Sequence, residues 1–185
     1  QGRYGAKVDV TSKDEPRNRV SLDIEIDEGE VAEIENINII GNNTFLDEDI
    51  LKDFELKTGG WFSFFTNDNR YSREKLKGDI ESLESFYKNK GYVEFKLISS
   101  QVSISSDKSS VFVTLNVSEG ETFKINEVKI VGDLPVDEEI LKSLVLIQTG
   151  EKFNQFLITE TEEIFKNILG NEGYSFAEVR GVPDI

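Results

Sequence analysis

The feature that most constrains the fold of this chain is an internal repeat. A Glu-Gly-Glu turn precedes an apolar run that ends at a glycine, and the same order begins again 91 residues further on. The landmarks that the two copies share start at Glu28 and Glu119, Gly41 and Gly132, Asp47 and Asp137, and Gly91 and Gly173. Self-similarity of this kind predicts copies of one supersecondary unit, stacked along the chain.

Hydrophobic periodicity assigns the elements of that unit. Apolar and polar residues alternate in Ser110–Val117, which is the period of a strand with one buried face, and Ile34–Ile40 forms a second strand-like run. Asp47–Leu56 begins with acidic residues that suit a helix N-terminus. A longer helix follows, which Gly91 ends as a C-cap. Its spacing of four, three and four residues places four side chains on one face, namely Leu76, Ile80, Leu83 and Tyr87.

Each copy therefore reads β-α-α-β-β, with the last two strands joined as a hairpin around residues 105–108. The predicted fold class is α+β, with a three-stranded mixed sheet and two helices on one face of it. We expect the core of the complete copy to contain Ile37, Ile39, Leu76, Ile80, Leu83, Val111, Val113 and Leu115.

The repeat divides the chain into three parts. Residues 1–30 hold the C-terminal hairpin of a preceding module, with strands at Tyr4–Val10 and Val20–Ile26. Residues 31–120 hold one complete module, and residues 121–185 hold a module without its last strand. The chain contains no methionine, so we expect it to be a segment of a longer protein.

The last module is expected to lack the central strand of its sheet. Its strands Phe123–Val131 and Tyr174–Gly181 correspond to the outer strands of the complete copy, and the central strand between them is the missing one. Unpaired backbone groups that are buried away from water are costly. Either another chain or further residues supply that strand, or Phe176–Ile185 is loosely held.

Composition excludes several functions. The formal net charge of -15 opposes the electrostatic attraction that dominates nucleic-acid binding, so we expect no nucleic-acid partner. The chain has no histidine and no cysteine, which removes most hydrolase, zinc and thiol chemistry. No phosphate-binding glycine motif or spaced calcium ligands occur. We therefore expect no enzymatic activity, no catalytic or metal-binding residues and no cofactor.

The modules resemble POTRA domains. Together with their order and spacing, the motifs that carry the resemblance to the BamA family are Pro16–Val20, Ile37–Asn42, Gly78–Leu83, Gly91-Tyr92 and Gln101–Ser103. The resemblance covers the whole chain and corresponds to the end of the second, all of the third and most of the fourth POTRA domain. It implies the periplasmic arm of an outer-membrane protein assembly machine, at the periplasmic side of the bacterial outer membrane, in front of a membrane β-barrel that is not in this chain.

The same resemblance implies the partners. They are a BamB-like accessory lipoprotein, other subunits of the assembly machine and unfolded outer-membrane proteins. An alternative within the wider family is the POTRA region of a secretion or translocation transporter, which recognises one dedicated substrate. The family positions that match a lipoprotein contact here are Leu56, Lys57 and Val102, while Ile98 replaces an acidic residue of familiar members.

The strand Val93–Ser105 is the candidate binding element. It is more polar than Ser110–Val117, so it reads as an edge strand, and edge strands can pair with an extended peptide by β-augmentation. With the family positions, the predicted partner-binding residues are Leu56, Lys57, Val93, Phe95, Leu97, Ser99, Gln101 and Val102. The opposing interpretation is an edge that Lys96 protects and that binds nothing.

An aromatic insertion lies between the two helices of the complete copy. We expect Trp61 and Phe62 to pack under the helices, because large exposed apolar patches are uncommon. For Phe64 and Phe65 both packing and exposure stay open.

Overall fold

The computed structural model describes residues 6–17, 19–28, 32–59, 69–133 and 135–185. They belong to two compact units. The first unit contains Gln1–Ser82 and Leu97–Val117, and the second contains Leu83–Lys96 and Ser118–Ile185. The aromatic residues Trp61, Phe62, Phe64 and Phe65 lie outside the described residues.

The first two strands form the predicted hairpin, but the first strand continues to Glu15 rather than ending at Val10. Strands β1 (Lys7–Glu15) and β2 (Arg19–Asp27) pair antiparallel, and Arg17 in the turn has a positive φ of 69°. The register sets Val8 opposite Ile26 and Val10 opposite Ile24, so the apolar residues of both strands share one face. That face is exposed among the described residues.

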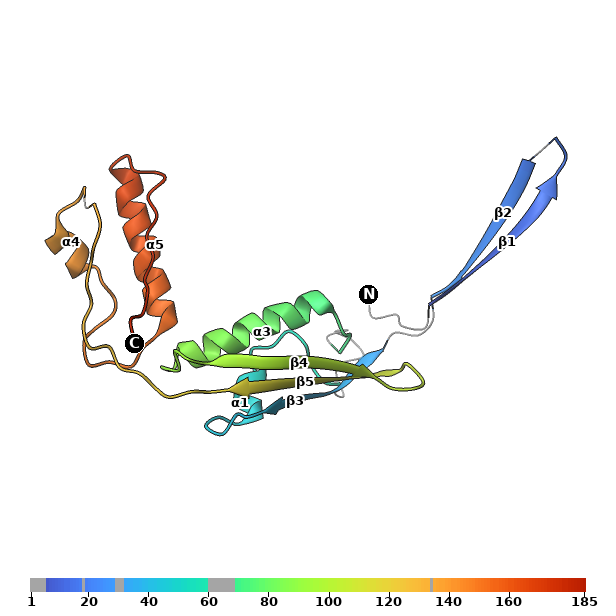
Figure 1. Ribbon diagram of the computed structural model, residues 1–185, viewed down its shortest axis with the longest axis horizontal. Helices are drawn as coiled ribbons and strands as arrows, with labels where there is room; N and C mark the ends of the chain where they lie inside the picture. The colour runs from blue at the N-terminus through green and yellow to red at the C-terminus, as the bar shows by residue number, and fades with distance from the viewer. Residues whose placement is uncertain (1–5, 18, 29–31, 60–68, 134) are drawn as a thin grey trace. The chain divides into compact units, whose positions relative to one another are not determined.

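The complete repeat folds around a three-stranded mixed sheet. Strands β3 (Glu33–Ile40), β4 (Lys96–Ile104) and β5 (Ser110–Ser118) lie in the order β3-β5-β4, with β3 and β5 parallel (Figure 1). A register shift between Ile34 and Asn36 explains why Ile34 and Ile37, three residues apart, are both buried. In β5, Val111, Val113, Leu115 and Val117 are buried and the residues between them are not, so one face of the sheet is covered.

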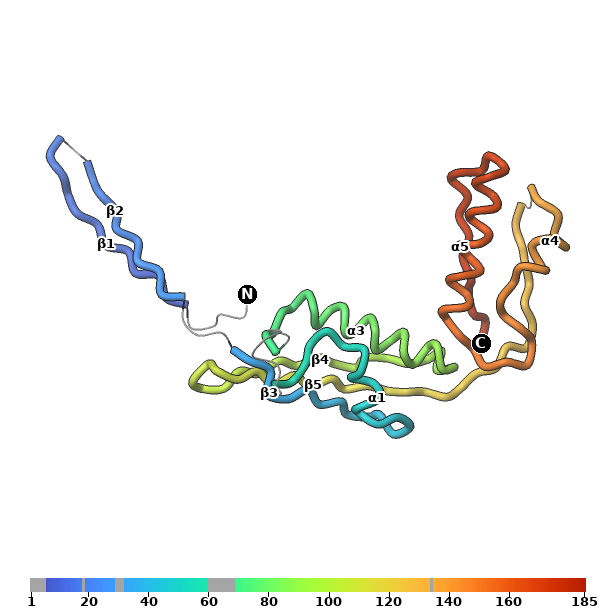
Figure 2. The backbone as a smooth tube through the Cα atoms, turned by 180° about the vertical axis from the view of Figure 1, so that it is seen from behind, coloured from blue at the N-terminus to red at the C-terminus, as the bar shows by residue number. Residues whose placement is uncertain are grey.

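Two helices accompany this sheet, as predicted. Helix α1 (Asp47–Leu51) is shorter than the predicted Asp47–Leu56, and α3 (Arg73–Lys88) begins after Ser72, whose hydroxyl accepts a bond from the N–H of Lys75. Figure 2 shows the same arrangement of α1, α3 and the strands from behind. The α+β class and the helix layer on one face of the sheet are thereby confirmed.

The buried face of α3 differs from the predicted one at a single position. Leu76, Leu83 and Tyr87 are buried as expected, but Ile80 is only partly buried, and the residue before it, Asp79, is 1% exposed. The helix is therefore turned so that a carboxylate, rather than an isoleucine, occupies the centre of its inner face. Gly91, with φ of 102°, ends the helical segment, and the N–H of Tyr92 donates to the carbonyl of Tyr87.

The second unit contains the helices of the last repeat. Helices α4 (Glu138–Ser143) and α5 (Gln155–Asn171) are capped at their N-termini by Asp137 and Asn154, whose side chains accept bonds from backbone N–H groups of the first turn. The strand predictions for Phe123–Val131 and Tyr174–Gly181 are wrong for this structure, because the described residues there form only an isolated bridge between Lys124 and Lys152. A β-strand requires a neighbouring strand with which its backbone can form hydrogen bonds. Among the described residues, no strand pairs with either of these two segments.

Candidate functional site

The candidate binding strand β4 lies at one edge of the sheet of the complete repeat. It pairs with β5, and the described residues place no further strand beside it (Figure 1). At the opposite edge, by contrast, Ile34 of β3 bonds through its N–H to the carbonyl of Asn69 and through its carbonyl to the N–H of Gly59. The edge that β4 presents is thus the more open of the two, as the polar sequence of this strand predicts.

The hairpin end beside this edge is fixed by a cluster of hydrogen bonds. The carboxylate of Asp107 accepts from the hydroxyl of Ser105 and from the N–H and the hydroxyl of Ser109. These bonds lower the pKa of Asp107 to about 2. The N–H of Ser105 donates to the carbonyl of Ser110, which closes the β4–β5 ladder.

The closing bond also determines which backbone groups of β4 are free to bind. In an antiparallel ladder the N–H and C=O of one residue point to the same side, and successive residues alternate. Because Ser105 is directed toward β5, the odd-numbered residues of β4 pair with β5. The even-numbered residues, among them Ser100 and Val102, then direct their N–H and C=O groups away from the sheet.

The side chains of β4 fall on two faces that differ in chemistry. The amide of Asn116 on β5 donates to the hydroxyl of Ser99 at 2.8 Å, so Ser99 lies on the face opposite the buried Val113 and Leu115. Leu97 and Gln101 share that face with Ser99 by alternation. The other face carries an apolar row that is exposed by 64%, 37% and 38%, formed by Ile98, Val102 and Ile104 respectively.

The apolar row changes the set of candidate contact residues. Val102 was among the predicted binding residues, whereas Ile98 and Ile104 were not. The sequence pattern does not reveal this row, because Leu97 stands beside Ile98 and Ser100 interrupts the period of two between Ile98 and Val102. Val93 and Phe95 precede β4, and the ring of Phe95 is buried and stacked on Tyr87 at 4.3 Å, so it packs rather than faces solvent.

Leu56 and Lys57 lie in the turn that follows α1. The side chain of Leu56 is 1% exposed, whereas Lys57 is exposed. The ammonium of Lys57 donates at 3.0 and 2.9 Å to the carbonyls of Leu51, the last residue of α1, and of Lys52, its C-cap. Of the two residues, only Lys57 therefore has its side chain at the surface.

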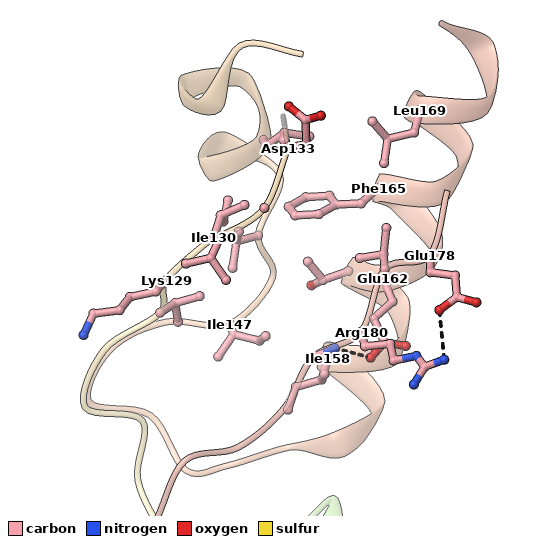
Figure 3. Close-up of a pocket in the computed structure, with 18 residues that line it drawn as sticks. Lys129, Ile130, Asp133, Ile147, Ile158, Glu162, Phe165, Leu169, Glu178 and Arg180 are labelled. Carbon is pink, nitrogen blue, oxygen red and sulfur yellow. Dashed lines mark hydrogen bonds and ion pairs between the residues drawn. The ribbon is translucent and has the colours of Figure 1, made fainter. Parts of the chain in front are cut away.

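A groove of about 270 Å³ lies in the second unit, between two extended segments and α5 (Figure 3). Val128–Asp133 forms one wall and Glu178–Gly181 the other, and Ile158, Phe165 and Leu169 project into it from α5. The N–H of Gly181 donates to the carboxylate of Glu162, which holds the second wall against the helix. In the complete repeat, the strand between the two corresponding segments is β5.

The described residues contain no group of three or more acidic side chains that could hold a metal ion. In the part of the chain that the structure describes, no helix has the length and apolar character needed to cross a membrane. The features of the first unit that a partner could contact are the open edge of β4 with its apolar row and, separately, the exposed Lys57 after α1.

Comparison with known proteins places this geometry in a family. The model of the POTRA family, described as a surface antigen variable number repeat, matches residues 32–120 and 123–185, which are most of the chain. Two curated relatives named outer membrane protein assembly factor BamA are each 30% identical over 185 residues. The one from Neisseria meningitidis matches 98% of this chain and 23% of its own length, and the one from Buchnera aphidicola matches 100% and 30%.

A solved structure shares the fold. The crystal structure of Haemophilus influenzae BamA POTRA3-5 superposes with a TM-score of 0.71 at 24% identity, and the match covers 83% of this chain and 60% of that one. The chain spans about a quarter of the length of the curated relatives. The repeat, the mixed sheet with its helices and the family match agree, and the chain belongs to the POTRA family.

Proposed function

We propose that this chain is a periplasmic, polypeptide-binding scaffold of an outer-membrane protein assembly machine, and that it has no catalytic role. The relatives that match nearly the whole chain carry the name of such an assembly factor. The observation that carries the proposal is the open edge of β4, with the apolar row of Ile98, Val102 and Ile104 beside it.

The edge supports binding of unfolded outer-membrane proteins by β-augmentation. An extended client pairs with the outward N–H and C=O groups of β4, and backbone pairing tolerates many side chains. The apolar row then contacts every second residue of the client, since side chains alternate along a strand. Clients that form membrane strands alternate apolar and polar residues themselves, so they present a matching apolar face.

The accessory lipoprotein is the second proposed partner. Lys57 and Val102 are its proposed direct contacts, because both side chains reach solvent. Leu56 supports this surface from inside the core, since its side chain is 1% exposed. A charged substitution at Leu56 would therefore report on folding rather than on the contact itself.

Two proline substitutions test strand pairing directly. Ser100→Pro removes an N–H that points away from the sheet, whereas Gln101→Pro, the matched control, removes one that pairs with β5. We expect Ser100→Pro to fold and to lose binding of an unfolded outer-membrane protein peptide, and Gln101→Pro to destabilise the repeat. Full binding by a folded Ser100→Pro variant would eliminate augmentation at this edge.

Site-specific photocrosslinking in cells identifies the partners. A crosslinker at Gln101 is expected to capture the lipoprotein and many different outer-membrane proteins, while one at exposed Lys77 on α3 is expected to capture far fewer. Capture of one dedicated substrate would instead favour a secretion transporter. Equal capture at both positions would contradict the proposed site.

A further inference from the structure

Asp79 is the one buried carboxylate on the inner face of α3 among the described residues. It is 1% exposed, and its two oxygens accept hydrogen bonds from consecutive backbone N–H groups, those of Glu55 at 2.6 Å and Leu56 at 3.0 Å. Loss of solvation raises the pKa of this carboxyl, and the two N–H bonds oppose that effect.

These bonds attach the turn after α1 to α3. Helix α1 has only five residues, which is far too few for a helix to be stable by itself. Downstream of it, Asp79 holds Glu55 and Leu56, and Lys57 then folds back to the last carbonyls of α1. Helix, turn and lysine thus form a closed loop that the carboxylate bonds to α3, beside the buried side chains of Ile50, Phe54 and Leu56.

A carboxylate suits this position for a chemical reason. It offers acceptors on both oxygens, whereas an amide of the same shape offers one acceptor and directs its NH₂ donors at the second N–H. A buried charge is weak evidence for stability, because desolvation offsets much of what its bonds contribute. An apolar side chain here would leave the N–H groups of Glu55 and Leu56 without an acceptor, so the carboxylate is explained by the two backbone groups that it holds.

We propose that Asp79 is a positioning residue for partner binding, which acts by holding the backbone of Glu55 and Leu56 so that Lys57 is presented in one fixed place. The inference rests on the proposed lipoprotein contact at Lys57. A lysine ammonium has three donors, and two of them are engaged by the carbonyls of α1. The third donor is then the one that an acidic or carbonyl acceptor on the partner would engage.

The test uses the full chain and the purified soluble form of the accessory lipoprotein from the same genome. Asp79→Asn is compared with Glu81→Gln, which removes an exposed charge from the same helix. Loss of charged hydrogen bonds is expected to weaken binding about tenfold for Asp79→Asn and to leave Glu81→Gln unchanged. Asp79→Ser, which is smaller and still accepts a bond, replaces Asp79→Asn if that variant does not fold.

Two further measurements separate positioning from a general loss of structure. In the NMR spectrum, the amide protons of Glu55 and Leu56 are expected to shift upfield in Asp79→Asn while those of β5 stay in place. In a double-mutant cycle, Lys57→Ala is expected to add little to the loss caused by Asp79→Asn, because both act on one contact.

The outcomes distinguish the inference from the proposed function. The positioning role would be overturned if the Glu55 and Leu56 amide protons of Asp79→Asn shift upfield while its affinity for the lipoprotein is unchanged. It would also be overturned if the losses of affinity in Asp79→Asn and Lys57→Ala are fully additive. In both cases the lipoprotein contact stands. No binding of the wild-type chain to the lipoprotein would overturn the proposed contact itself, and the positioning role with it.

Discussion

The substitution Leu83→Ala tests the packing of the longest helix of the complete repeat. Leu83 is 0% exposed and lies on the buried face of α3. The change removes three carbon atoms, worth roughly 0.8 kcal/mol each in transfer free energy, and leaves a cavity that adds to the loss. We therefore expect the free energy of unfolding to fall by about 2 to 5 kcal/mol.

A matched control, Leu46→Ala, shows whether the loss of stability in Leu83→Ala comes from burial. Leu46→Ala removes the same atoms from a side chain that is 70% exposed, so we expect a change within about 0.5 kcal/mol. Because the chain forms two units and α3 has residues in both, the unfolding free energy is read from amide exchange within α3 itself. If Leu83→Ala proves as mild as Leu46→Ala, the assignment of the buried face of α3 is refuted.

Three further predictions concern other parts of the chain. The pKa of Asp107 is lowered to about 2, so its stabilisation of the β4–β5 turn should be present above its ordinary value of 3.8 and be lost as pH falls toward 2. Asp107→Asn should remove this pH dependence from amide exchange in the turn, and an unchanged profile would contradict it. Adding about 15 residues after Ile185, a turn and one strand, should protect amides 123–131 from exchange, and no protection would show that the repeat alignment of the last module is wrong. Leu56→Asp should lower the melting temperature strongly in circular dichroism because it buries a charge, whereas Lys57→Ala should leave it nearly unchanged; similar melting curves for the two variants would disprove the inward orientation of Leu56.

The local sequence pattern was sufficient to predict the position of β4 in the sheet, but not which of its faces each side chain occupies. The polar composition of Lys96–Ile104 against the apolar β5 predicted that β4 is an edge strand, and the structure places it at the edge. Sequence could not assign the two faces of β4, because that requires knowing which residue pairs with which across the hairpin. The bond between Asn116 and Ser99 supplies this, and with it the apolar row.

Sequence by itself determined the elements of the complete repeat and their order. Periodicity is a local property: alternation specifies a strand and spacing of three and four specifies a helix wherever the chain lies. The β-α-α-β-β reading, the β1–β2 hairpin and the helix C-cap at Gly91 all follow from such local patterns. The family resemblance of the repeat was visible at the same level.

Only the tertiary structure decided those features that depend on contacts between residues distant in the sequence. Asp79 rather than Ile80 occupies the centre of the inner face of α3, because the N–H groups of Glu55 and Leu56 lie opposite it. Phe123–Val131 has the pattern of a strand but forms none, since a strand needs a ladder partner as well as a sequence. Hydrogen bonds between remote segments carry no periodic signature, and they determine which residues of this chain are buried, held in place or open to a partner.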